Sequence, residues 1–125
     1  MERLYPQELD LHTLSPLALA FVGDGVYSLM VRERLLSQAN RPVADLHRLA
    51  VREVRAEAQA AAMDRLLPHL TEEEEAVFKR GRNAHSTRTG AEYHRATGLE
   101  SLFGYLYLAG RIDRVRELFA LCVED

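Results

Sequence analysis

Two acidic residues that interrupt apolar segments are the side chains of this chain best suited to chemistry. Asp24 lies at the centre of the segment 14–31, and Glu100 interrupts a second apolar segment, 97–109. A helix that is apolar on nearly every face is expected to be buried, so the sequence predicts two core helices that each carry one acid. Burying an ionised carboxylate is costly unless a cation, hydrogen-bond donors, a raised pKa or a metal ion compensates it.

A metal ion shared by Asp24 and Glu100 is the hypothesis that this pattern favours. Carboxylate and water oxygens are the ligands that Mg²⁺ and Mn²⁺ prefer. The five histidines show no paired metal-binding spacing, and no Ser/His/Asp order indicates a nucleophilic hydrolase. If the chain is an enzyme, the acids indicate metal-activated water attacking a phosphodiester. A buried arginine beside Asp24 would instead make the chain a purely structural helical protein.

Basic and small hydrogen-bonding side chains gather in the segment 79–88, and this composition suits phosphate binding. The same cations could instead balance the glutamates at 72–75 on a solvated surface. A second set of arginines recurs at i, i+4 and i+7, on one face of a predicted helix, where surface ion pairs are the alternative. The candidate nucleic-acid-binding residues are Lys79, Arg80, Arg82, Asn83, His85, Ser86 and Arg88, with Arg48, Arg52 and Arg55 as the second set.

The bulk composition is that of a folded globular chain. At 125 residues, with 47% hydrophobic and 28% charged residues, we expect one domain, 1–125, with a hydrophobic core. The net charge of −3 gives no overall basicity, so nucleic-acid binding would depend on local patches. A single cysteine, Cys122, excludes an internal disulfide and a cysteine-rich zinc site. Neither a secretory leader nor a membrane span is recognised, which predicts a cytoplasmic protein.

Helix signals cover most of the chain and no segment indicates a strand, so the sequence predicts an all-α fold. Ser15 and Pro16 form a helix start, and Thr71 with Glu74 forms a capping box. Pro68 and Gly110 are expected to end helices. The long helix 43–67 is expected to bend near residues 49–51. The predicted helices are 16–37, 43–67, 72–81, 93–109 and 112–123.

The two acidic motifs resemble those of the ribonuclease III catalytic domain. The first reads F-V-G-D-G-V at 21–26, where the family has F-L-G-D-A-V. The second reads E-S-L-F-G-Y-L-Y-L at 100–108, where the family has E-A-L-I-G-A-L-Y-L. The block 71–86 and Asp45-Leu46-His47 resemble the Mini-ribonuclease III branch, which has no double-stranded-RNA-binding domain.

The resemblance implies a homodimeric helical bundle that cleaves double-stranded RNA with Mg²⁺, for which Mn²⁺ can substitute. It places Asp24 and Glu100 as catalytic, metal-binding residues and allows Thr97 to orient a metal-bound water. Ala20, Leu17 and Thr97 stand where full-length members have acids, so fewer side chains and more waters would hold the metal.

Family members mature the ends of large-subunit (23S) ribosomal RNA. The resemblance therefore implies precursor ribosomal RNA as the substrate and a ribosomal protein as a candidate partner. The alternative is a non-catalytic RNA-binding or ribosome-associated protein that retains the fold.

Overall fold

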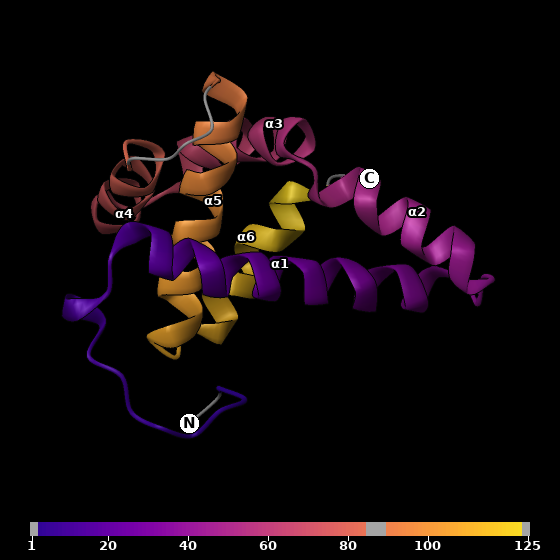
Figure 1. The fold of residues 1–125 in the computed structure, drawn as a ribbon, viewed down its shortest axis with the longest axis horizontal. Coiled ribbons are helices and arrows are strands. Elements are labelled where there is room, and N and C mark those ends of the chain that lie inside the picture. Colours follow the sequence, from indigo (N-terminus) through magenta and orange to yellow (C-terminus); the bar gives the residue numbers. More distant parts are fainter. Residues whose placement is uncertain (1–2, 85–89, 124–125) are drawn as a thin grey trace.

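The computed structural model describes residues 3–84 and 90–123, and every regular element in those ranges is helical (Figure 1). The all-α prediction is confirmed. None of the described helices is both long and apolar enough to cross a membrane. The elements are η1 (Leu11–Thr13), α1 (Pro16–Gln38), α2 (Val43–Val54), α3 (Ala56–Leu66), η2 (Leu67–His69), α4 (Glu72–Arg82), α5 (Ala91–Leu108) and α6 (Ile112–Cys122).

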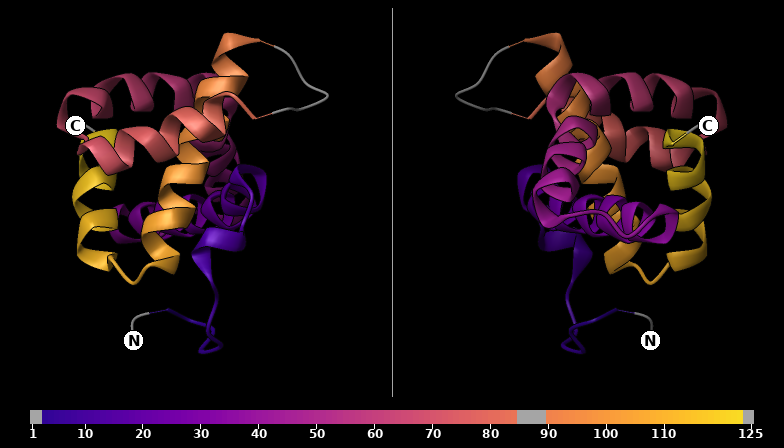
Figure 2. Two further views of the ribbon diagram at one scale, coloured as in Figure 1. Left: turned by 90° about the vertical axis from the view of Figure 1, so that its left-hand side faces the viewer. Right: turned by 90° about the vertical axis from the view of Figure 1, so that its right-hand side faces the viewer.

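Helix α5 is the centre of the bundle. It packs against α1, α3, α4 and α6, and the views in Figures 1 and 2 show these helices arranged around it. Leu99, Leu102, Phe103 and Leu106 of α5 are fully buried. The helix ends as predicted, because Gly110 adopts a φ of +79° and the Arg111 N–H donates to the Leu106 carbonyl at 2.9 Å.

Within the single chain, helix α1 is buried along one face only, whereas its apolar composition predicted burial on nearly every face. The exposed fraction is 82% for Phe21, 41% for Leu17 and 45% for Leu29, and Asp24 is also exposed. Composition alone does not separate a fully buried helix from one whose second apolar face lies at the surface of the chain. The buried face consists of Leu19, Ala20, Gly23, Tyr27, Val31 and Leu35.

The predicted helix 43–67 is two helices, and the break lies at Arg55 rather than near residues 49–51. Arg55 has extended backbone angles (φ −72°, ψ 157°), and its N–H caps α2 by donating to the Val51 carbonyl at 3.2 Å. Arg55 therefore lies outside the helix that carries Arg48 and Arg52. The prediction of one continuous three-arginine face is wrong.

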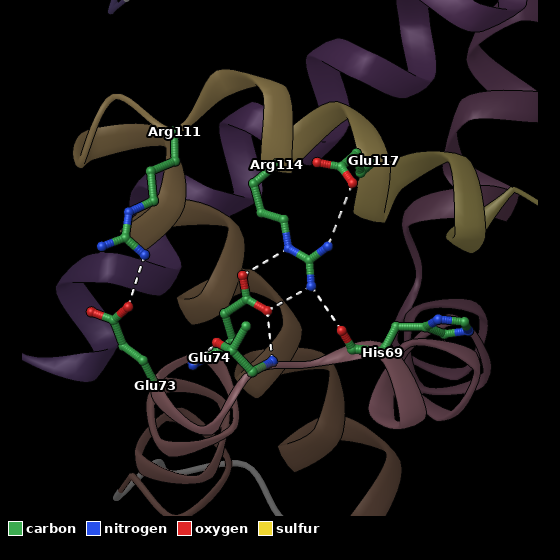
Figure 3. A network of polar contacts seen from close by, with 7 residues as sticks. His69, Glu73, Glu74, Arg111, Arg114 and Glu117 are labelled. Carbon is green, nitrogen blue, oxygen red and sulfur yellow. Dashed lines mark hydrogen bonds and ion pairs between the residues drawn. The ribbon is translucent and has the colours of Figure 1, made fainter.

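Helix α4 is fixed at its N-terminus by the predicted capping box and by α6. Thr71 Oγ1 accepts from the Glu74 N–H at 3.2 Å, and the Glu74 carboxylate accepts from the Thr71 N–H at 3.0 Å. Arg114 of α6 donates to both Glu74 oxygens at 2.8 Å and to the His69 carbonyl at 2.7 Å (Figure 3). The hydrogen bonds from Arg114 hold the pKa of the buried Glu74 carboxyl below its usual range.

Candidate functional site

A close crossing of α1 and α5 brings the two acids together. A Cβ atom on Gly23 would lie 1.7 Å from the Glu100 carbonyl oxygen, and one on Gly104 would lie 1.9 Å from the Leu19 carbonyl oxygen. Only glycine fits at these two positions, so the two helix backbones are in contact there. Asp24 follows Gly23 on α1, and its side chain interacts with that of Glu100 of α5 in the same groove.

Both carboxylates line an open groove of about 580 Å³. Asp24 comes from α1, and Thr97 and Glu100 come from α5. The remaining wall is formed at the break between α2 and α3, where Arg55 and Gln59 line the groove. Three separate parts of the chain thus converge on the acid pair.

The environment of Glu100 disfavours its charged form. Burial, followed by the hydrogen bond and the negative charge of Asp24, raises the pKa of Glu100 to about 8, while the Gln59 amide acts in the opposite direction. At neutral pH this carboxyl therefore keeps a proton unless a cation takes its place. A carboxyl whose pKa is shifted into this range, next to a second acid in a groove, is typical of a functional site.

The number of acids available to a metal is small. Within residues 3–84 and 90–123, no three or more His, Cys, Asp or Glu side chains gather in a way that could hold a metal ion. Asp24 and Glu100 form a pair, and the neighbouring side chains Ala20 and Leu17 in the groove are apolar.

Thr97, the third residue predicted at this site, lines the same groove and is buried. Its hydroxyl donates to the Tyr93 carbonyl at 3.0 Å. Because that bond uses its only proton, Thr97 can act toward the groove as a hydrogen-bond acceptor. An acceptor is what a metal-bound water requires.

Gln59 is the residue of this groove that the sequence reasoning missed. Its exposed fraction is 1%, and it lies on the buried face of α3 with Met63 and Leu66. The spacing of these three residues, at i, i+4 and i+7, was a signal that this glutamine points inward. The alanine-rich composition around it concealed that signal.

The predicted RNA-binding residues of α4 do not line the acid groove. Lys79 and Arg80 are exposed, and the Lys79 Nζ lies 3.8 Å from a Glu75 carboxylate oxygen. Arg82 lies over the Phe78 ring, 5.5 Å from its centroid, and donates to the exposed Asn83, the C-cap residue of α4, at 3.3 Å. No residue that lines the groove belongs to α4. Three further predicted residues, His85, Ser86 and Arg88, lie outside the described residues.

The second arginine set is divided by the break in the helix. Arg48 is exposed and pairs with Asp45 at 2.9 Å. Arg52 lines a neighbouring groove, on the side of α2 that faces Arg34 and Arg65. Arg55 lines both that groove and the acid groove, and its Nε lies 2.9 Å from a Glu57 carboxylate oxygen. Of the described cations predicted to bind RNA, Arg55 is the one at the acid pair.

Comparison with known proteins identifies the family. A family model described as "Ribonuclease III domain" matches residues 17–111. "Mini-ribonuclease 3" of a Thermoanaerobacter species is 47% identical over 90% of this chain and 82% of the relative. "Mini-ribonuclease 3" of Symbiobacterium thermophilum is 50% identical over 85% of each chain. A crystal structure of a protein from Fusobacterium nucleatum superposes with a TM-score of 0.84 at 25% identity, over 94% of this chain and 100% of that chain.

Proposed function

The chain belongs to the ribonuclease III family of endoribonucleases that cleave double-stranded RNA, and we propose that Asp24 and Glu100 are its catalytic, metal-binding residues. The observation that carries this proposal is the meeting of the two carboxyls in one groove, where burial and the negative charge of Asp24 disfavour the charged form of Glu100. A cation between them would remove that conflict.

The residues present fit a divalent cation, and we propose Mg²⁺, with Mn²⁺ able to replace it. The donor set is two carboxylates, the oxygen ligands that these hard cations prefer. When bound, the ion would supply an activated water and positive charge next to the leaving oxygen. Asp24 and Glu100 would hold it, and water and phosphate oxygens would complete its ligands because Ala20 and Leu17 offer none.

The other groove residues have roles that follow from their donors and acceptors. Thr97 accepts a hydrogen bond from a water in the groove, since its own proton is held by the Tyr93 carbonyl. Arg55, at the break between α2 and α3, holds a phosphate of the substrate beside the acids. The guanidinium is already paired with Glu57, so phosphate would compete with that surface ion pair.

The described cations of α4, together with Arg48 and Arg52, do not line the acid groove. We propose that they contact phosphates elsewhere along the duplex, where each contact would add affinity that falls with salt. Asn83, His85 and Ser86 would contact sugar hydroxyls, the groups by which proteins distinguish RNA from DNA. The proposed phosphate-binding residues are Lys79, Arg80, Arg82 and Arg88, with Arg48 and Arg52 as a second set.

A second copy of the chain is the proposed partner at the exposed face of α1. Phe21, Leu17 and Leu29 are large apolar side chains exposed on the helix that carries Asp24. Exposed apolar side chains gathered on one helix favour an interaction site. A symmetric dimer would cover them and present two acid grooves, one for each strand of a duplex.

The similarity to Mini-ribonuclease 3 supports a further proposal about the substrate. We propose that the 1–125 domain acts in the cytoplasm on a duplex stem of precursor large-subunit ribosomal RNA, with a ribosomal protein as a candidate partner. Cleavage assays on that stem and on an unrelated duplex of equal length would test this, and equal rates on both would contradict it.

The proposed activity is tested by comparing the cleavage of three nucleic acids that share one base sequence. A labelled RNA duplex, its separated strands and the matching DNA duplex are incubated with the protein and Mg²⁺. We expect cleavage of both strands of the RNA duplex and of neither other substrate. Retention of the RNA duplex in a gel-shift assay without any product would instead support the non-catalytic alternative.

A further inference from the structure

Gln59 is a buried polar side chain whose donor has no partner. Only 1% of the residue is exposed, and within the described part of the chain its Nε2 atom makes no hydrogen bond. Buried side-chain donors are satisfied in the large majority of cases, because an unpaired donor loses its hydration without replacement. An unpaired amide that lines a groove with two acids therefore needs a functional explanation.

Among the described residues, the acidic and hydroxyl acceptors that line the groove with Gln59 are Asp24, Thr97 and Glu100. The Thr97 hydroxyl is already bonded to the Tyr93 carbonyl, and Asp24 is exposed to solvent. Glu100 is the acid that is shielded from solvent together with Gln59, and the amide of Gln59 acts on its carboxyl against the effect of burial. The Glu100 carboxyl is therefore the acceptor in this groove best suited to the Nε2 donor.

We propose that Gln59 is a positioning residue for Glu100: its Nε2 donates to one carboxylate oxygen of Glu100 and holds the carboxylate in the orientation that binds the metal. This inference rests on the proposed metal-binding role of Glu100. Hydrogen-bond donors placed behind a metal ligand fix its orientation, and their loss typically weakens metal binding 10- to 100-fold. The packing of α3 against α5 makes Gln59 a rigid support.

The experiment separates positioning from packing by measuring stability and metal affinity in the same variants. Gln59→Leu removes the amide and keeps a side chain of similar volume in the core. Metal-free thermal unfolding and calorimetric Mn²⁺ titration are compared with wild type and with Gln38→Leu, a control at the exposed end of α1. We expect the Gln59→Leu protein to unfold at the wild-type temperature or above, because it no longer buries an unpaired donor. We expect its Mn²⁺ affinity to fall about tenfold.

A second readout is the Mg²⁺ concentration that gives half of the maximal cleavage rate. For Gln59→Leu this concentration should rise about tenfold, whereas the rate at saturating Mg²⁺ stays close to that of wild type. Gln59→Met, which keeps the length of the side chain, should behave in the same way and serves if the leucine variant does not fold.

The possible failures are distinguishable. Wild-type Mn²⁺ affinity in both Gln59 variants, with no binding in Glu100→Gln, would overturn the role of Gln59 and leave the metal site intact. A metal-free protein destabilised by the loss of Gln59, with unchanged affinity, would make Gln59 a packing residue. Absence of Mn²⁺ binding in wild type would overturn the proposed metal site and the inference together.

Discussion

The Glu100→Gln substitution is expected to stabilise the metal-free protein at neutral pH. Burial and the neighbouring Asp24 raise the pKa of Glu100 from 4.5 to about 8 in the folded chain. Between these two values the folded state keeps a proton that the unfolded state releases. Wild-type stability is therefore fully present below about pH 4.5 and declines as the pH rises toward about 8.

The size of this effect follows from the shift. One pKa unit corresponds to about 1.4 kcal/mol, so the interval from 4.5 to pH 7 sets an upper limit of about 3.5 kcal/mol. Because the groove is open to solvent, screening reduces the expected effect to about 1–2 kcal/mol. Glutamine is neutral at every pH and mimics the protonated carboxyl, so the variant should escape this loss.

Urea unfolding in the presence of a chelator, at about pH 5 and about pH 7.5, measures the effect. Wild type and Glu100→Gln should differ little at the lower pH, and the variant should be more stable at the higher pH. Glu92→Gln, an exposed position on the same helix, is the matched control and should follow wild type. Parallel pH dependence of wild type and Glu100→Gln would refute the electrostatic account of the site.

Three further predictions concern the crossing of α1 and α5, the proposed dimer, and the contact between Arg114 and Glu74. Gly23→Ala places a Cβ 1.7 Å from a carbonyl oxygen of α5 and should lower the free energy of unfolding by about 1–3 kcal/mol or more. A Cβ on Gly25 would have no atom within 4 Å, so Gly25→Ala should raise the free energy of unfolding by up to about 1 kcal/mol. Urea unfolding of both variants tests this difference. Phe21→Lys should yield a folded monomer in analytical ultracentrifugation, because that side chain is 82% exposed in the single chain, and an intact dimer would contradict the proposed interface. Arg114→Met should destabilise the fold by about 3 kcal/mol at neutral pH, because the buried Glu74 carboxylate loses its cation and keeps only the hydrogen bond from the Thr71 N–H. Since Arg114 depresses the Glu74 pKa, the stability that this pair contributes is lost as the pH falls below about 4.5. A difference in free energy of unfolding between wild type and Arg114→Met that stays constant as the pH falls through about 4.5 would contradict this prediction.

The helices were largely predictable because their ends are specified locally. Ser15 with Pro16, Thr71 with Glu74, and Gly110 determine hydrogen bonds within a few residues, and the structure contains these caps. The break at Arg55 was misplaced because neither that residue nor its neighbours disfavour a helix. Tertiary packing imposes the break, since α2 lies along α1 whereas α3 lies against α5.

The candidate site was predictable to the extent that it depends on patterns within single helices. An acid in an apolar helix indicated Asp24 and Glu100, and the structure places both in one groove. Which apolar residues of 14–31, such as Phe21, are exposed in the single chain does not follow from composition, because apolar residues occur both in cores and at exposed surfaces. The α4 cations lie outside the groove because of the side of α5 on which α4 packs. No pattern within a single helix indicates which side that is.

Cleavage of a labelled RNA duplex in Mg²⁺ by wild type, Asp24→Asn and Glu100→Gln tests the central claim most directly. The two substitutions keep the size of each side chain and remove its charge, and Glu92→Gln again provides the control. The account predicts that wild type and the control cut both strands, and that the two site variants fold normally but leave the duplex intact. Cleavage by either site variant at the wild-type rate would contradict the assignment of a metal-binding carboxylate pair.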